Sequence, residues 1–142
     1  MPEWSPASAR PRHDDADEAA TALGPSVQEK ESPMIFIVVK FPVKPEHAEE
    51  WPEIVREFTE ATRAEPGNKW FDWSRSLEDP NEYVLVEAFD DDAAEAHVTS
   101  DHFQKATAEG GPMHQALAAT PKIISRPIQG EDWEAMGELQ VD

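Results

Sequence analysis

The chain has 142 residues, no cysteine and a formal net charge of −18 at pH 7. This length suits a single domain, and the lack of cysteine excludes disulfides, thiolate nucleophiles and cysteine-ligated metal sites. The surplus of carboxylates excludes nucleic acid and anionic membrane surfaces as partners, because both are bound by clustered Lys and Arg.

Residues 1–33 contain five prolines and carry three Lys or Arg against seven Asp or Glu. They show no apolar periodicity, and such a composition buries too little surface to offset the entropy of ordering the chain. We therefore predict a mobile, acidic, proline-rich N-terminal arm. The arm also lacks the apolar core of a secretory signal, so we expect a cytoplasmic protein.

The apolar, β-branched segment "MIFIVVKF" (34–41) predicts a strand that is buried on both faces. Its apolar run is too short to cross a bilayer. A helix is predicted next, because Trp51, Ile54, Phe58 and Ala61 recur at spacings of three and four. Pro52 suits the first turn of that helix, and "EPGN" (65–68) ends it.

Two alternating segments follow, "KWFDWSRSL" (69–77) and "YVLVEAF" (83–89), and the turn-forming "EDPNE" joins them. They predict a β-hairpin. One face of the first strand carries Phe71, Trp73 and Leu77. One face of the second strand carries Tyr83, Leu85, Glu87 and Phe89.

The segment "DDDAAEAHVTSDHFQKATAE" begins with Asp residues that complement a helix N-terminus. It predicts a helix to about Glu109, with a possible break near Thr99–Ser100. A short helix "MHQALAA" and an edge strand "PKIISRPI" (121–128) follow. Residues 129–142 carry five acids and no base, and this acidic tail offers Trp133 and Leu139 as possible anchors.

The predicted order β-α-β-β-α-β indicates a ferredoxin-like α+β domain over residues 34–128. A single helical layer would leave one apolar face of the sheet exposed to water. We therefore expect a homodimer that covers this face.

Three segments resemble, in the same order, the antibiotic biosynthesis monooxygenase (ABM) domain family, whose members include cofactor-free quinol monooxygenases. These segments are "AEPGN", "DPNEYVLVEAF" and "EAHVTSDHFQKA". The resemblance covers residues 34–128. It implies a dimeric α/β-barrel with a pocket between the sheet and the helices of each subunit, and a partner subunit on the opposite face of the sheet.

The resemblance also implies which side chains face that pocket: Phe71, Trp73, Tyr83, Leu85, Glu87, Phe89, His97 and His102. Two departures narrow the expected chemistry. Leu85 and Phe89 stand where the aromatic-polyketide branch has Asn and Trp, so that mechanism is not expected here. Thr107 stands where the haem-degrading branch has its iron-ligating His, so haem degradation is not expected either.

His97 and His102 point about 140° apart on a continuous helix, so they cannot face one metal ion unless the helix breaks between them. No third ligand follows from spacing, and we predict no metal. His97 is instead the proposed base, since an imidazole takes a proton from a phenol near pH 7. Its alternative is packing at the rim of the sheet. For His102 the alternatives are a helix-start hydrogen bond and substrate contact.

Glu87 is expensive to bury unpaired. It either pairs with Arg75 or Arg126, or shares a wet cavity with His97 and orients it. Asn68 either caps the turn or donates to a substrate oxygen. Each aromatic residue is best explained by packing in the core or at the dimer interface, and as a group they would also suit a flat aromatic substrate. They are Trp70, Phe71, Trp73, Tyr83, Phe89 and Phe103.

These inferences favour a cofactor-independent monooxygenase that oxidises a quinol or related phenolic compound with dioxygen. Its base would be His97, assisted by Glu87, and the cavity wall would include Trp73, Phe89 and Phe103. Two alternatives stay open at this point: an isomerase of small metabolites, and a non-catalytic module that binds a hydrophobic ligand.

Overall fold

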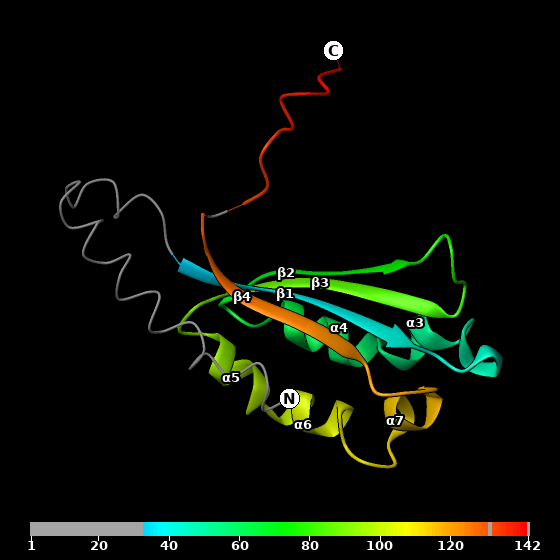
Figure 1. The fold of residues 1–142 in the computed structure, drawn as a ribbon. Coiled ribbons are helices and arrows are strands. Elements are labelled where there is room, and N and C mark those ends of the chain that lie inside the picture. The colour runs from blue at the N-terminus through cyan, green and yellow to red at the C-terminus, as the bar shows by residue number, and fades with distance from the viewer. Residues whose placement is uncertain (1–32, 131, 142) are drawn as a thin grey trace.

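The computed structural model describes residues 33–130 and 132–141, so the predicted N-terminal arm lies outside it except for Pro33. Figure 1 shows a sheet with helices along one side. In chain order the elements are β1 (Pro33–Pro42), the 3₁₀ helix η3 (Pro45–His47), α3 (Trp51–Ile54), α4 (Arg56–Arg63), β2 (Asn68–Arg75), β3 (Glu82–Asp90), α5 (Ala94–Val98), α6 (Asp101–Ala106), α7 (Pro112–Ala116) and β4 (Lys122–Gln129).

The four strands form one antiparallel sheet in the order β2-β3-β1-β4. β2 and β3 make the predicted hairpin, and β4 lies at the edge, as Pro121 before it and Pro127 within it suggest. The ferredoxin-like α+β fold is therefore confirmed. None of the helices in the described part of the chain has the length and apolar character needed to cross a membrane.

The core lies between the sheet and the helices. β1 and β3 pair in register Ile37↔Glu87 and Val39↔Leu85, so these side chains share the face that the helices cover. On the opposite face of β1, Met34 is buried, but Phe36 and Val38 are only half-buried and Lys40 is exposed. The prediction that this strand is buried on both faces is therefore wrong for a single chain, because helices cover one face only (Figure 1).

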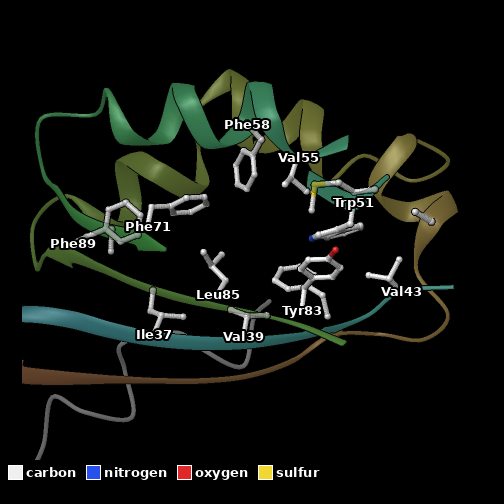
Figure 2. Close-up of a cluster of buried hydrophobic side chains, with 14 of the residues drawn as sticks. Ile37, Val39, Val43, Trp51, Val55, Phe58, Phe71, Tyr83, Leu85 and Phe89 are labelled. Atoms are coloured by element: carbon white, nitrogen blue, oxygen red, sulfur yellow. The ribbon is translucent and has the colours of Figure 1, made fainter. Parts of the chain in front are cut away.

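The helix predicted from Trp51 onwards is interrupted at Val55, which separates α3 from α4. Pro52 occupies the first turn, as expected, where its missing N–H leaves no helical hydrogen bond unmade. Val55 and Phe58 are buried, and Figure 2 shows both directed from the helices toward the sheet. α4 packs against β2 and α6, and α3 packs against α7.

Leu77 is fully exposed and lies beyond the end of β2, so the prediction that it shares one strand face with Phe71 and Trp73 is wrong. β2 ends at Arg75, whose guanidinium is bound by the carbonyl of Pro80 and by Glu49. The Ser76 hydroxyl accepts hydrogen bonds from the backbone N–H groups of Glu78 and Asp79 in the turn that follows. The turn thus begins before Leu77 and carries it into solvent.

The acidic tail makes one aromatic contact in its described part. The Trp133 ring lies 4.7 Å from that of Trp70 on β2, although Trp133 is still 64% exposed. Leu139 is 71% exposed and anchors nothing. Of the two proposed anchors, only Trp133 contacts the domain.

Candidate active site

The turn between α4 and β2 is held tightly against the start of α5. A Cβ atom added at Gly67 would lie 2.1 Å from the Cβ of Ala93, so only glycine fits there. The Asp90 N–H donates to the Gly67 carbonyl at 2.9 Å. Asn68 donates through Nδ2 to the carbonyls of Trp70 and Ala88. This close contact brings Glu65, at the start of the turn, next to α5.

Ser100 separates α5 from α6. Its hydroxyl accepts from the Phe103 N–H at 3.2 Å, capping α6, and donates to the His97 carbonyl at 2.6 Å. Because the helix breaks here, both imidazoles reach one carboxylate oxygen. Oε2 of Glu65 lies 2.9 Å from Nδ1 of His97 and is also hydrogen-bonded to Nε2 of His102. The sequence predicted the break but not this convergence.

The contacts with Glu65 assign a tautomer to each imidazole in its neutral form. An ionised carboxylate only accepts hydrogen bonds, so His97 donates from Nδ1 and His102 from Nε2. Each ring keeps its other nitrogen as a proton acceptor. Burial lowers the pKa of His97, and the hydrogen bond to Glu65 partly opposes this shift. The cluster is therefore built to receive a proton.

The same three side chains are a donor set of the kind that transition metals bind, and their ligand atoms lie within 4.8 Å of one another. An ion there would bind the ring nitrogens that face Glu65, and each neutral imidazole would then carry its proton on the other ring nitrogen. The helix break at Ser100 thus removes the geometric ground on which no metal was expected for His97 and His102.

Glu87 lies in the core beside this cluster and is 7% exposed. Its Oε1 has no hydrogen-bond partner in the described structure, and neither Arg75 nor Arg126 reaches it: Arg75 binds Glu49 and Arg126 binds the Ser125 carbonyl. Burial, with a smaller contribution from the negative charge of Glu65, raises the pKa of Glu87 to about 8. Glu87 is therefore a neutral acid near pH 7.

Glu87 and His97 share a hollow of about 20 Å³ that is otherwise lined by Ile37, Phe89, Ala94, Val98 and Phe103. This volume holds about one water molecule. The Phe89 ring lies 4.5 Å from that of His97, and Figure 2 shows Phe71, Leu85 and Phe89 directed into the space between helices and sheet. The expected pocket between the two layers is therefore filled by the protein's own side chains.

Two larger grooves flank α4. We call the first the helical groove; it has a volume of about 290 Å³ and is lined by Ile54, Glu57, Phe58, Ala61, His102, Lys105, Ala106, Pro112 and Met113. We call the second the tryptophan groove; it has a volume of about 230 Å³ and is lined by Trp51, Pro52, Val55, Arg56, Thr59, Glu60, Arg63, Trp73 and Tyr83.

Comparison with known proteins places this chain among proteins of one family. The family model for antibiotic biosynthesis monooxygenases (ABM) matches residues 34–109, which is more than half of the chain. The chain belongs to this family.

Individual relatives agree with this assignment. The Bacillus subtilis protein named "Putative monooxygenase YcnE" is 33% identical over 78 residues, which span 54% of this chain and 82% of that protein. A solved structure from Nitrosomonas europaea, named for the ABM family, is 29% identical with a TM-score of 0.59 and covers 65% of this chain and 86% of its own. Another solved structure, from Caulobacter crescentus, is 25% identical with a TM-score of 0.62. The match covers 72% of this chain and 92% of the Caulobacter chain.

In this ABM-family protein the predicted site residues do not line one common pocket. Phe89 and Phe103 surround His97, and Phe71 lies beside them in the core. His102 lines the helical groove. Trp73 and His97 were predicted to share one cavity, but among the described residues they line separate hollows.

Two more predicted residues have polar groups that the fold already uses. The Tyr83 hydroxyl donates to the Ala48 carbonyl at 2.8 Å within the core. Asn68 holds the start of β2 and lines none of the three hollows, which supports its turn-capping alternative.

Glu65 is the residue that sequence reasoning missed. It was placed only in the segment that ends the first helix, 32 residues before His97. A usable signal was present, since Pro-Gly directly after Glu65 predicts a tight turn that holds this carboxylate against neighbouring structure.

Proposed function

We propose that this protein is a cofactor-independent monooxygenase that oxidises a quinol or related phenolic compound with dioxygen. Membership of the ABM family and the name of its Bacillus subtilis relative support the reaction class. The observation that carries the proposal is the Glu65–His97–His102 cluster, with His102 at the wall of an apolar groove.

The cluster supplies the step that this chemistry requires. A neutral quinol reacts slowly with dioxygen, whereas its anion is electron-rich enough to react directly. An imidazole with a free nitrogen removes the hydroxyl proton, and Glu65 stabilises the imidazolium that forms. Addition of dioxygen at the ring and loss of water then give a hydroxyquinone. Quinol and dioxygen are thus converted into hydroxyquinone and water.

The catalytic assignments of His97 and Glu87 remain part of this proposal. His97 belongs to the proton-accepting cluster. Its orienting carboxylate is Glu65, because the hydrogen bond runs to that residue. Glu87, held neutral in the adjacent hollow, is suited to donate a hydrogen bond toward His97 or toward a small molecule there.

The protein is also proposed to act as a homodimer. The face of the sheet that no helix covers carries Phe36, Val38, Val86 and Trp70, all half-buried, and Ile124, which is 62% exposed. Trp133 of the tail contacts this face at Trp70. A second copy that covers this face would remove the apolar surface from water. Size-exclusion chromatography with light scattering tests this point, since a mass of 15.9 kDa at all concentrations would contradict it.

Aerobic and anaerobic incubation of the purified protein with menadiol tests the reaction. We expect dioxygen-dependent turnover that gains one oxygen atom, shown by product mass with isotopically labelled dioxygen. The variant His97→Ala/His102→Ala should lose this turnover. His47→Ala is the matched control, because His47 pairs with Glu50 on the surface at 3.1 Å, away from the grooves.

Each other outcome contradicts a named part of the proposal. A product with unchanged mass would indicate an isomerase, and binding of quinones in a thermal-shift assay without turnover would indicate a binding module. Turnover that is lost after dialysis against a chelator and restored by a divalent metal would overturn the cofactor-independent mechanism.

A further inference from the structure

We propose that Glu65, His97 and His102 form a binding site for one divalent transition-metal ion such as Zn²⁺. Its ligand atoms are Oε2 of Glu65, Nδ1 of His97 and Nε2 of His102, which converge from the turn after α4 and from the helices α5 and α6. Such a site goes beyond the proposed function and does not depend on it, since it requires only these atoms and the groups around them.

The three ligand atoms are nearly as close together as a metal site requires. They lie within 4.8 Å of one another, and Nδ1 of His97 is 2.9 Å from Oε2 of Glu65. An ion bonded at about 2.0 to 2.2 Å to nitrogen and oxygen holds its ligand atoms roughly 3 to 4 Å apart. Small side-chain rotations are therefore enough to make room for the ion.

The chemistry of the donor set selects the kind of ion. Imidazole nitrogen suits Zn²⁺, Ni²⁺, Cu²⁺ and Fe²⁺, whereas Ca²⁺ and Mg²⁺ take oxygen ligands. Two neutral imidazoles and one carboxylate carry a single negative charge, which attracts a divalent cation. Three protein ligands also leave a coordination position for water. Zn²⁺ is therefore a suitable test ion.

The ligands are held in place by contacts that an ion would not disturb. The packing of Gly67 on Ala93 keeps the turn that carries Glu65 against α5. The break at Ser100 lets α5 and α6 each direct one histidine toward that turn. None of these contacts uses an imidazole nitrogen. The cluster is therefore preorganised to exchange its hydrogen bonds for bonds to a metal.

Glu87 is a second, independent observation that points to a metal. The side chain is 7% exposed, and its Oε1 has no hydrogen-bond partner among the described residues. Glu87 shares with His97 a hollow of about 20 Å³, which is the size of one water molecule. A metal-bound imidazole almost always donates its other N–H to a carboxylate, a carbonyl or water. Once Nδ1 of His97 binds the ion, its Nε2–H has Glu87 or a bridging water as acceptor.

His102 gives the ion a route into the cluster. Its side chain is 26% exposed and lines the helical groove, whereas that of His97 is 5% exposed. A bound ion would tie the turn after α4 to α5 and α6, and the unfolded chain does not bring these ligands together. Zn²⁺ should therefore raise the melting temperature, and the rise should grow with Zn²⁺ concentration.

Zn²⁺ binding is measured by isothermal titration calorimetry on tag-free protein that has been treated with a chelator. Excess Ca²⁺ stays in the buffer, because it prefers oxygen ligands and occupies exposed carboxylates. We expect one Zn²⁺ per chain. His102→Ala should weaken this binding more than about 100-fold, the upper limit for losing an outer-shell partner. Glu65→Ala repeats the test from the turn if His102→Ala fails to fold.

Two further substitutions separate the ligands from their surroundings. His47→Ala removes an imidazole from an exposed pair with Glu50, at 3.1 Å, and should bind Zn²⁺ as the wild type does. Glu87→Leu removes the proposed acceptor of the His97 N–H and should weaken Zn²⁺ binding about 10- to 100-fold. Glu87→Gln keeps an acceptor oxygen and should lose less than Glu87→Leu.

Nitrogen NMR of the imidazoles gives a signature that an ion on surface carboxylates would not produce. The contacts with Glu65 place the proton of neutral His97 on Nδ1 and that of neutral His102 on Nε2. Zn²⁺ takes these two nitrogens, so each proton should move to the other nitrogen of its ring. The signals of His47 should stay unchanged.

The outcomes separate the metal site from the proposed function. Wild-type Zn²⁺ affinity in both His102→Ala and Glu65→Ala, or histidine signals that Zn²⁺ leaves unchanged, would overturn the site. Turnover of menadiol by metal-free protein that binds no Zn²⁺ would also overturn the site and leave the function standing. Zn²⁺ binding at the cluster without turnover, in metal-free and in loaded protein, would contradict the monooxygenase function and leave the site standing.

Discussion

The two faces of α4 are similar in shape and differ in what their polar groups are free to do. Both border a groove of comparable volume, and aromatic side chains contribute to both: Trp51, Trp73 and Tyr83 in the tryptophan groove, and Phe58 in the helical groove. In the tryptophan groove, Trp73 donates to the Thr59 hydroxyl at 2.9 Å, and Arg63 donates twice to the Phe71 carbonyl. Those groups hold the fold together.

On the other face, the helical groove ends at an imidazole with an unused ring nitrogen, backed by a carboxylate and a second imidazole. The comparison shows that aromatic lining alone does not identify a site in this fold. The deciding feature is a polar group whose hydrogen-bonding capacity the protein has not consumed.

The largest expected effect comes from comparing two substitutions, one beside each groove of α4. Glu65→Gln leaves the shape of the cluster but cannot balance an imidazolium, so we expect kcat for menadiol to fall about 10²-fold or more. Thr59→Val, on the tryptophan side, should leave kcat unchanged and cost about 1 to 3 kcal/mol of unfolding free energy, because Trp73 loses its acceptor. Steady-state kinetics and urea unfolding check both, and equal losses of kcat would remove the distinction between the grooves.

The next effect concerns Glu87, the acid that neither groove exposes. Its pKa is raised from 4.5 to about 8 in the folded protein. Between these two values the folded state keeps a proton that the unfolded state has lost, so stability falls as pH rises. The free energy of unfolding is therefore lower above pH 8 than below pH 4.5, by about 4 to 5 kcal/mol at 1.36 kcal/mol per pKa unit.

Glu87→Gln should remove this slope, so the variant gains stability over the wild type between pH 5 and 8. Urea unfolding across that range measures the difference between the two proteins, in which other titrating groups largely cancel. Glu95→Gln makes the same change of charge on the exposed side of α5 and should follow the wild-type curve. Parallel curves for Glu87→Gln and the wild type would show that Glu87 is ionised in the fold.

A smaller effect tests the contact that places Glu65 beside the helical groove, the packing of Gly67 against Ala93. Gly67→Ala places a Cβ 2.1 Å from that of Ala93, which forces the turn carrying Glu65 away from α5. We expect a loss of about 1 to 3 kcal/mol from overpacking, together with weaker catalysis. The double variant Gly67→Ala/Ala93→Gly restores the space, and recovery of both stability and kcat would show that contact, not glycine flexibility, is what the turn requires.

The features of the fold that depend on local sequence patterns could be predicted from the sequence. Apolar alternation with turn residues predicted the β2–β3 hairpin, and Pro52 predicted the first turn of α3. The Asp residues at 90–92 did not cap α5, which begins at Ala94 without a side-chain cap. Leu77 was placed wrongly because alternation cannot show where pairing stops, and here Arg75 and Ser76 begin the turn earlier.

The candidate site could not be predicted fully, because it is formed by contacts between residues that are far apart in the sequence. Glu65 reaches His97 across 32 residues through the close fit of Gly67 on Ala93. The expected pocket also failed for a physical reason: Phe71 and Phe89 are large enough to fill the layer between helices and sheet, and that layer closes on them. The two larger grooves lie outside this layer, on either side of α4.

The smallest predicted effect tests the helix break that lets two histidines share one carboxylate. Ser100→Ala removes the cap of α6 and should cost about 1 kcal/mol. Thr107→Ala is the matched control, since its hydroxyl only bonds the Phe103 carbonyl at the other end of the same helix. If the cap also fixes His102 relative to Glu65, Ser100→Ala lowers kcat several-fold while Thr107→Ala does not. A stability loss without any change in kcat would instead mean that packing around Phe58 and Phe103 alone holds the two imidazoles on their common oxygen.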